Sequence, residues 1–189
     1  MSNFFNRYRS IIIYIAKFIA IFCVAYYGTI AVEGLAKPGN LYSPFIEKYC
    51  DYPSWLRASL LWGAKIFVGW CGYNSVVTDP YHLKIIGGAS VQLIYACLGV
   101  GVMSFWLAFV VANKGSWKKR LLWLLGGCLC IWIINVLRIG LVLIQNNSRK
   151  ELMFGLDNHT FFNILSYVAI FGLILLYDRS FKKNVEVKM

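Results

Sequence analysis

Three side chains of the 189-residue chain are of the types that work together in nucleophilic catalysis: Cys97, Arg138 and His159. The thiolate is the nucleophilic form of cysteine, and a neighbouring cation stabilises it. A histidine transfers protons to and from reacting groups, and an arginine stabilises an oxyanion. The three lie far apart in the chain, so they can act together only if the elements that carry them place them in one layer of the fold.

Each of the three has companions at helical spacing. Asn135 lies one helical turn before Arg138, and Asn163 lies one turn after His159. Such spacing puts the members of a pair on one face of a helix. The same faces continue at Cys128, Gln145 and Ser166, and small residues follow Cys97 at Gly101, Ser104 and Ala108. Small residues allow helices to approach closely, so the pattern predicts a helix bundle that encloses a polar site.

The composition predicts an integral membrane protein. Hydrophobic residues make up 59% of the chain and charged residues only 14%, against about a quarter charged in soluble domains. This excludes a disordered chain and argues against a soluble enzyme. Four runs are apolar enough to be predicted as membrane spans: 11–32, 95–112, 121–145 and 161–177. The first is expected to remain an uncleaved span, because it is too long for the core of a signal peptide.

Two further segments are expected outside these spans. Residues 58–77 are apolar but carry Lys65 and three glycines, and we interpret them as interfacial or re-entrant. Residues 81–86 and 90–95 flank Gly87, Gly88 and Ala89, which predicts a short outer β-hairpin. The predicted fold is a single all-α polytopic membrane domain over residues 1–189, with about four transmembrane helices, the interfacial segment and the hairpin.

The charge distribution predicts the orientation. The net charge is +11, and the basic excess lies at the N-terminus, in residues 113–120 and after residue 177. Because basic segments remain cytoplasmic, the chain is expected to cross the cytoplasmic (inner) membrane with both termini on the cytoplasmic side. The excess of basic residues is explained by membrane orientation and by contact with membrane lipids, so nucleic acid is not an expected partner.

The three candidate residues are expected at a similar depth in the membrane. Counted from the inner span ends, Cys97, Arg138 and His159 lie about 24, 27 and 28 Å away at about 1.5 Å per residue. They therefore share a layer near the outer face. Taken singly, each has an ordinary explanation, since cysteine packs in spans, arginine reaches lipid head groups and histidine sits at interfaces. No Cys/His spacing predicts a metal site or cofactor, and Cys50 and Cys71 remain open as a disulfide pair or as free thiols.

At these residues the sequence resembles the exosortase/archaeosortase family of membrane cysteine transpeptidases. The resemblance rests on Cys97 with Gly99 two residues later, on the Asn-x-x-Arg pattern of Asn135 and Arg138, and on His159 before the last span. It covers residues 58–178, the family-like catalytic core. Leu98 replaces a serine often found after the cysteine, and Asn163 stands where many members carry glycine.

The resemblance implies a cysteine protease and transpeptidase of the cell envelope that cleaves C-terminal sorting signals of exported proteins. Cys97 would form a thioester with the substrate, His159 would move the proton, and Arg138 would hold the thiolate or oxyanion, with Asn135 and Asn163 in support. A lipid or a surface glycan precursor would accept the protein. Three other classes remain open: a non-enzymatic membrane scaffold, a membrane thiol oxidoreductase with Cys50 or Cys71 as second thiol, and a transporter subunit.

Overall fold

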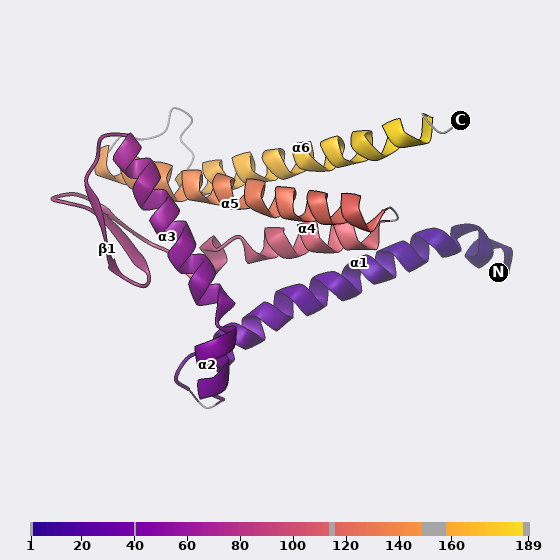
Figure 1. Cartoon of the computed structure of the whole chain (residues 1–189), viewed down its shortest axis with the longest axis horizontal. Helices are drawn as coiled ribbons and strands as arrows, with labels where there is room; N and C mark the ends of the chain where they lie inside the picture. Colours follow the sequence, from indigo (N-terminus) through magenta and orange to yellow (C-terminus); the bar gives the residue numbers. More distant parts are fainter. Residues whose placement is uncertain (1, 40, 114–115, 149–157, 187–189) are drawn as a thin grey trace. The chain divides into compact units, whose positions relative to one another are not determined.

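The structure, a computed structural model, describes residues 2–39, 41–113, 116–148 and 158–186, with side chains except at 2–7, 158–163, 165–166 and 181–186. The helices are α1 (Ser2–Leu35), α2 (Pro44–Cys50), α3 (Tyr52–Trp70), the short 3₁₀ helix η1 (Tyr95–Cys97), α4 (Val100–Ala112), α5 (Trp117–Ser148) and α6 (Asn158–Glu186) (Figure 1). The strands are β1 (Ser75–Asp79), β2 (His82–Ile85) and β3 (Ser90–Gln92).

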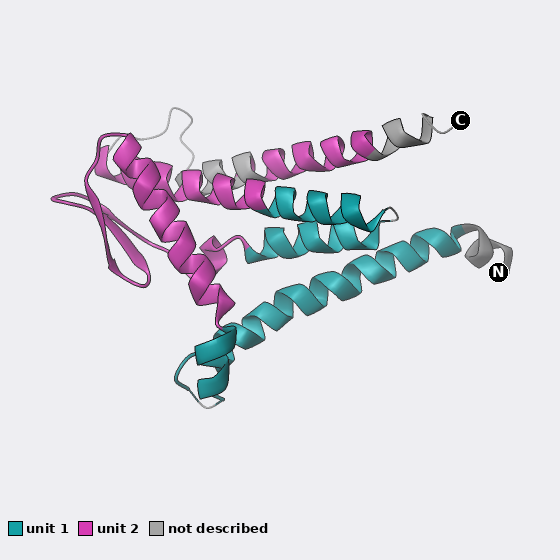
Figure 2. Cartoon of the chain, viewed as in Figure 1, with its two compact units in different colours: residues 1–50, 100–128 teal, residues 51–99, 129–189 magenta. Residues whose placement is uncertain are grey.

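The chain forms two compact units (Figure 2). Unit 1 comprises residues 1–50 and 100–128, and unit 2 comprises residues 51–99 and 129–189. In unit 1, α1 and α4 pack antiparallel, because Phe18 meets Phe105 edge to face at 5.3 Å between ring centroids while Tyr14 meets Asn113 further along. Aromatic pairs of this geometry add to the stability that burial of the rings provides.

In unit 2, α3 and the second half of α5 pack closely through glycines. A Cβ atom on Gly63 would lie 2.7 Å from a methyl group of Val136, and one on Gly140 would lie 2.4 Å from the ring of Phe67. Trp132 also donates its indole N–H to the hydroxyl of Ser59 at 3.1 Å. Small residues permit this approach of two helix backbones, and it fixes the face of α5 on which Asn135 and Val136 are buried.

Both ends of α3 have local causes. At its start Asp51 accepts a hydrogen bond from the backbone N–H of Ser54 at 3.1 Å, and Pro53 occupies the first turn, as is favourable at helix N-termini. At its end Gly72 adopts a φ of +87°, a conformation that glycine reaches without steric cost. The helix therefore stops at Trp70, and the chain turns into β1.

The three strands form an antiparallel sheet in the order β1-β2-β3. Leu83 and Ile85 of β2 are buried, and the turn between β2 and β3 is held on α5, where the amide oxygen of Asn147 accepts from the N–H of Ala89 at 3.1 Å. The buried guanidinium of Arg57 stacks on the ring of Tyr81 at 4.6 Å. Helices α3 and α5 thus anchor the sheet from both ends.

The structure differs from the sequence prediction in two segments. Residues 58–77 are not one element: α3 begins earlier, at Tyr52, and ends at Trp70, and the last residues of the segment belong to β1. The sheet accordingly has a third strand that the sequence did not predict, because Gly72 breaks the apolar run by its backbone conformation and not by its polarity. The predicted strands 81–86 and 90–95 appear as the shorter β2 and β3.

Two of the helices in the described ranges are long and apolar enough to cross a membrane, Tyr8–Leu35 and Trp117–Ser148. They correspond to the predicted runs 11–32 and 121–145. Helix α4 is apolar but has only 13 residues, fewer than the roughly 20 that a span needs. The total of four spans therefore stays a prediction.

Candidate active site

Cys97 lies at the end of η1, a single 3₁₀ turn that precedes α4. The backbone N–H groups of Cys97 and Leu98 donate to the carbonyl groups of Ile94 and Tyr95 at 2.9 and 3.1 Å. This corrects the expectation that Cys97 belongs to a continuous helix over residues 95–112, because α4 begins only at Val100. The depth of Cys97 therefore cannot be counted along one helix, and it does not share a helical stripe with Gly101, Ser104 and Ala108.

Gly99 makes the break between η1 and α4. Its φ is +75°, in the left-handed region that side chains with a Cβ atom avoid. The position is also crowded, since a Cβ atom here would lie 2.7 Å from the amide nitrogen of Asn135. Both the conformation and the close approach require glycine, so the residue shapes the turn that presents Cys97.

Asn135 holds this turn from α5. Its side-chain Nδ2 donates to the carbonyl oxygen of Cys97 at 3.2 Å, and the residue is 5% exposed. A buried amide that pairs with a backbone carbonyl fixes the position of both groups, because leaving either unpaired is costly. The sequence had suggested that Asn135 orients Arg138. That role stays a prediction, and the structure adds a contact of Asn135 with the backbone of the cysteine.

Arg138 lies one turn further along α5, on the same side as Asn135. Its guanidinium Nη2 donates to Sγ of Cys97 at 3.9 Å. A cation next to sulfur favours thiolate chemistry in general, and a guanidinium can also pair with an oxyanion. Two neighbouring turns of α5 thus contact Cys97, one through its backbone and one through its sulfur.

The structure brings together Cys97, Arg138 and Asn135. His159 and Asn163 belong to the sequence of α6 (Asn158–Glu186), but their side chains lie outside the described residues. Their part in the site stays a prediction. The role of Gly99 escaped the sequence analysis, although the glycine two residues after Cys97 belongs to the motif that carries the family resemblance.

Two further pairs of polar side chains have shifted pKa values with a local cause. Near the β1–β2 turn, His82 hydrogen-bonds Asp79 at 2.8 Å and, together with the N–H of Tyr81, lowers the pKa of that carboxyl group. In the first turn of α2, Glu47 accepts from the hydroxyl of Tyr42, which precedes this helix, and this hydrogen bond raises the pKa of the phenol. The two pairs join residues only three and five positions apart in the chain, and neither belongs to the candidate site.

The remaining cysteines and possible metal ligands give no second centre. Cys50 and Cys71 are exposed free thiols, and they lie in different units. Within the described ranges no three His, Cys, Asp or Glu side chains gather in a way that would hold a metal ion. The described part of the chain therefore offers one cluster for nucleophilic chemistry, the group of Cys97, Asn135 and Arg138.

Comparison with known proteins gives one match. The family model described as transmembrane exosortase (Exosortase_EpsH) matches residues 13–176, which include the whole candidate site. No curated protein and no solved structure matches the chain. The match covers most of the sequence and agrees with the long apolar helices α1 and α5. The chain is a membrane protein and belongs to the transmembrane exosortase family.

Proposed function

We propose that this protein is a membrane-embedded cysteine transpeptidase that cleaves C-terminal sorting signals of exported proteins, with Cys97 as nucleophile. The observation that carries the proposal is the contact of the Arg138 guanidinium with Sγ of Cys97 at 3.9 Å. In an apolar chain this pairing is costly to build without a use, because charged groups within membrane helices are expensive and are most often functional.

The proposed chemistry has two steps, which combine the contacts of Cys97 and Arg138 with the predicted role of His159. In the first, the Cys97 thiolate attacks a backbone carbonyl carbon of the substrate, and Arg138 stabilises the negative charge on sulfur and then on the carbonyl oxygen. The C–N bond breaks, the leaving amine takes a proton from His159, and a thioester remains on Cys97. In the second, an acceptor nucleophile gives its proton to His159 and attacks the thioester, which releases the product and restores the thiolate.

The contact between Asn135 and the Cys97 carbonyl supports a positioning role for Asn135. Its amide nitrogen holds the η1 turn through a 3.2 Å hydrogen bond to the Cys97 carbonyl oxygen, and holding a nucleophile in place removes much of the entropic part of a reaction barrier. The expected place of work is the outer face of the inner membrane, where the tail of an exported substrate emerges from its own span. The expected acceptor is a lipid or a surface glycan precursor.

The test is to express the full chain together with an exported reporter that ends in a candidate motif, an apolar span and a basic cluster from the same genome. Mass spectrometry should find an acyl group on Cys97, and Cys97→Ser should accumulate in the membrane without processing the reporter. Arg138→Gln should lower the processing rate about 10²–10³-fold, as expected for the loss of an oxyanion partner.

The matched control replaces the two exposed cysteines. Cys50→Ala combined with Cys71→Ala removes free thiols but leaves the contacts of Cys97 untouched, so processing should continue at the wild-type rate. A membrane thiol oxidoreductase would lose activity in this double variant, because it needs two cysteines in reach of each other. Normal processing by Cys97→Ser would overturn the proposal.

A further inference from the structure

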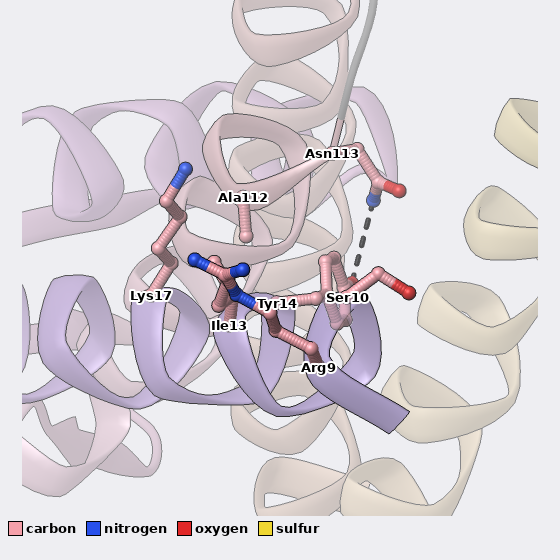
Figure 3. A pocket seen from close by; sticks show the side chains of 7 residues that line it. All are labelled: Arg9, Ser10, Ile13, Tyr14, Lys17, Ala112 and Asn113. Atoms are coloured by element: carbon pink, nitrogen blue, oxygen red, sulfur yellow. Dashed lines mark hydrogen bonds between the residues drawn. The ribbon is translucent and has the colours of Figure 1, made fainter. Parts of the chain in front are cut away.

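Unit 1 contains a second group of polar side chains, which the proposed chemistry of Cys97 does not use. A cavity of about 640 Å³ opens between α1 and the end of α4 (Figure 3), and its polar lining is Arg9, Ser10, Tyr14, Lys17 and Asn113. Its volume falls within the roughly 300–1,000 Å³ typical of small-molecule sites. Arg9, Ser10 and Lys17 are exposed and Tyr14 and Asn113 are half-buried, so a ligand can enter without displacing the core.

The lining offers hydrogen-bond donors and positive charge. Arg9 and Lys17 lie two helical turns apart on one face of α1 with Tyr14 between them. Asn113 donates to the hydroxyl oxygen of Tyr14 at 3.4 Å and to the carbonyl oxygen of Phe109 at 2.8 Å. Because the Tyr14 oxygen accepts this bond, its own proton is available to a ligand. A guanidinium, an ammonium group and two hydroxyl groups together select an acceptor with negative charge.

The chain segments that build the cavity supply no such acceptor. Residues 1–32 and 100–128 contain no Asp and no Glu. The acidic residues of unit 1 are Glu33 and Glu47, which contact Lys37 and Tyr42 respectively. Glu33 lies about 24 Å beyond Lys17 along α1 at the helical rise. The two cations of the cavity therefore need a counter-ion from outside these segments.

The position of Lys17 indicates where the counter-ion comes from. Arg9 and Lys17 both belong to Tyr8–Leu35, one of the helices that are apolar enough to cross a membrane, and Lys17 lies about 13 Å from Tyr8 along the axis. A lysine at this depth is costly unless it meets a polar or anionic group. Basic pockets between membrane helices bind the head groups of anionic lipids.

We propose that the cavity lined by Arg9, Tyr14, Lys17 and Asn113 is a binding site for a phosphate group, supplied by the head group of an anionic membrane lipid. The guanidinium of Arg9 and the ammonium of Lys17 neutralise the phosphate, and the hydroxyl groups of Tyr14 and Ser10 donate to its oxygens. The site would bind one specific lipid, and the proposal does not depend on the proposed chemistry of Cys97.

The experiment uses the full chain, purified in neutral detergent and stripped of lipid, with native mass spectrometry as the readout. Dioleoylphosphatidylglycerol should bind as one retained molecule, and dioleoylphosphatidylcholine should bind more weakly. Arg9→Gln combined with Lys17→Gln should weaken phosphatidylglycerol binding about 25-fold, since each cation contributes about a fivefold factor near an anionic head group. The matched control is Lys118→Gln combined with Lys119→Gln, which removes the same charge from unit 1 outside the cavity lining and should change binding less than twofold.

Inorganic phosphate and sn-glycerol 1-phosphate form the soluble arm. Displacement of the lipid by either compound at equal concentration supports the phosphate site and assigns it to a soluble phosphate. If the double variant fails to accumulate, Arg9→Gln alone should still weaken binding about fivefold, and high salt should weaken wild-type binding. Equal binding of the two lipids, or equal loss in the cavity variant and the control variant, would overturn the proposal.

Discussion

Alanine at position 99 would meet two separate obstacles. The φ of Gly99 is +75°, which costs a residue with a Cβ atom about 1–2 kcal/mol. The new Cβ would also lie 2.7 Å from Nδ2 of Asn135, so the amide must move and its hydrogen bond to the Cys97 carbonyl is lost. Such a bond contributes about 1 kcal/mol. Gly99→Ala should therefore lower the free energy of unfolding by about 2–3 kcal/mol.

Gly72 provides the matched control in the same unit. Its φ is +87°, and a Cβ atom there would meet nothing within 4 Å. Gly72→Ala carries only the conformational penalty, about 1–2 kcal/mol. The loss of unfolded-state entropy that accompanies any Gly→Ala change is common to both variants and cancels in the comparison. The difference between the two variants, about 1 kcal/mol, isolates the contact with Asn135.

Equilibrium unfolding in mixed micelles with a rising fraction of sodium dodecyl sulfate, followed by tryptophan fluorescence, measures both variants. A double-mutant cycle with Asn135→Ala completes the test, because removing the amide also removes the clash. The double variant should be less destabilised than the sum of its parts by about 1 kcal/mol, and processing of the reporter should fall in each variant of the cycle. Equal cost at positions 72 and 99, or additivity in the cycle, would refute the reasoning.

Two further predictions concern the packing of Trp106 and the pair of Asp79 and His82. Gly127→Ala places a Cβ 2.0 Å from the indole nitrogen of the fully buried Trp106, whereas the new Cβ of Gly126→Ala meets nothing within 4 Å. Thermal melting should therefore show Gly127→Ala destabilised by about 1–3 kcal/mol and Gly126→Ala stabilised by about 0.5–1 kcal/mol. Stability shifts of the same sign in the two variants would contradict this packing. Asp79 has a lowered pKa through His82, so its contribution to stability is complete above its unfolded pKa of about 4 and is lost as pH falls through the lower folded value. Carboxyl-carbon NMR should show the Asp79 titration at higher pH in His82→Gln, and unchanged midpoints would count against the contact.

The sequence alone identified the membrane class and the residues of the candidate site. Apolar runs as long as 11–32 and 121–145 have few other uses, because a bilayer admits only segments whose polar backbone groups are paired internally. The structure has apolar helices of sufficient length at both places. The Asn-x-x-Arg pattern on a helix likewise put Asn135 and Arg138 one turn apart on one face, as α5 has them.

The places where the helices break could not be predicted from the sequence. Gly72 and Gly99 both take positive φ values, but the chain has 16 glycines and composition does not distinguish those that turn the backbone from those that admit a neighbouring helix. Gly63 and Gly140 belong to the second kind, since each lies against a side chain of the opposite helix. The third strand β1 was missed for the same reason, because its boundary depends on the turn at Gly72.

The sequence by itself determined which residues are candidates for the chemistry and that the chain is a membrane protein, because residue type, apolar length and helical period are local properties. Tertiary structure decided what those side chains touch. It places Cys97 on a 3₁₀ turn ahead of α4, pairs the amide of Asn135 with the Cys97 carbonyl, and places the guanidinium of Arg138 next to the sulfur. Contacts between residues about 40 positions apart depend on how α3, α5 and the turn pack, and no local pattern encodes that distance.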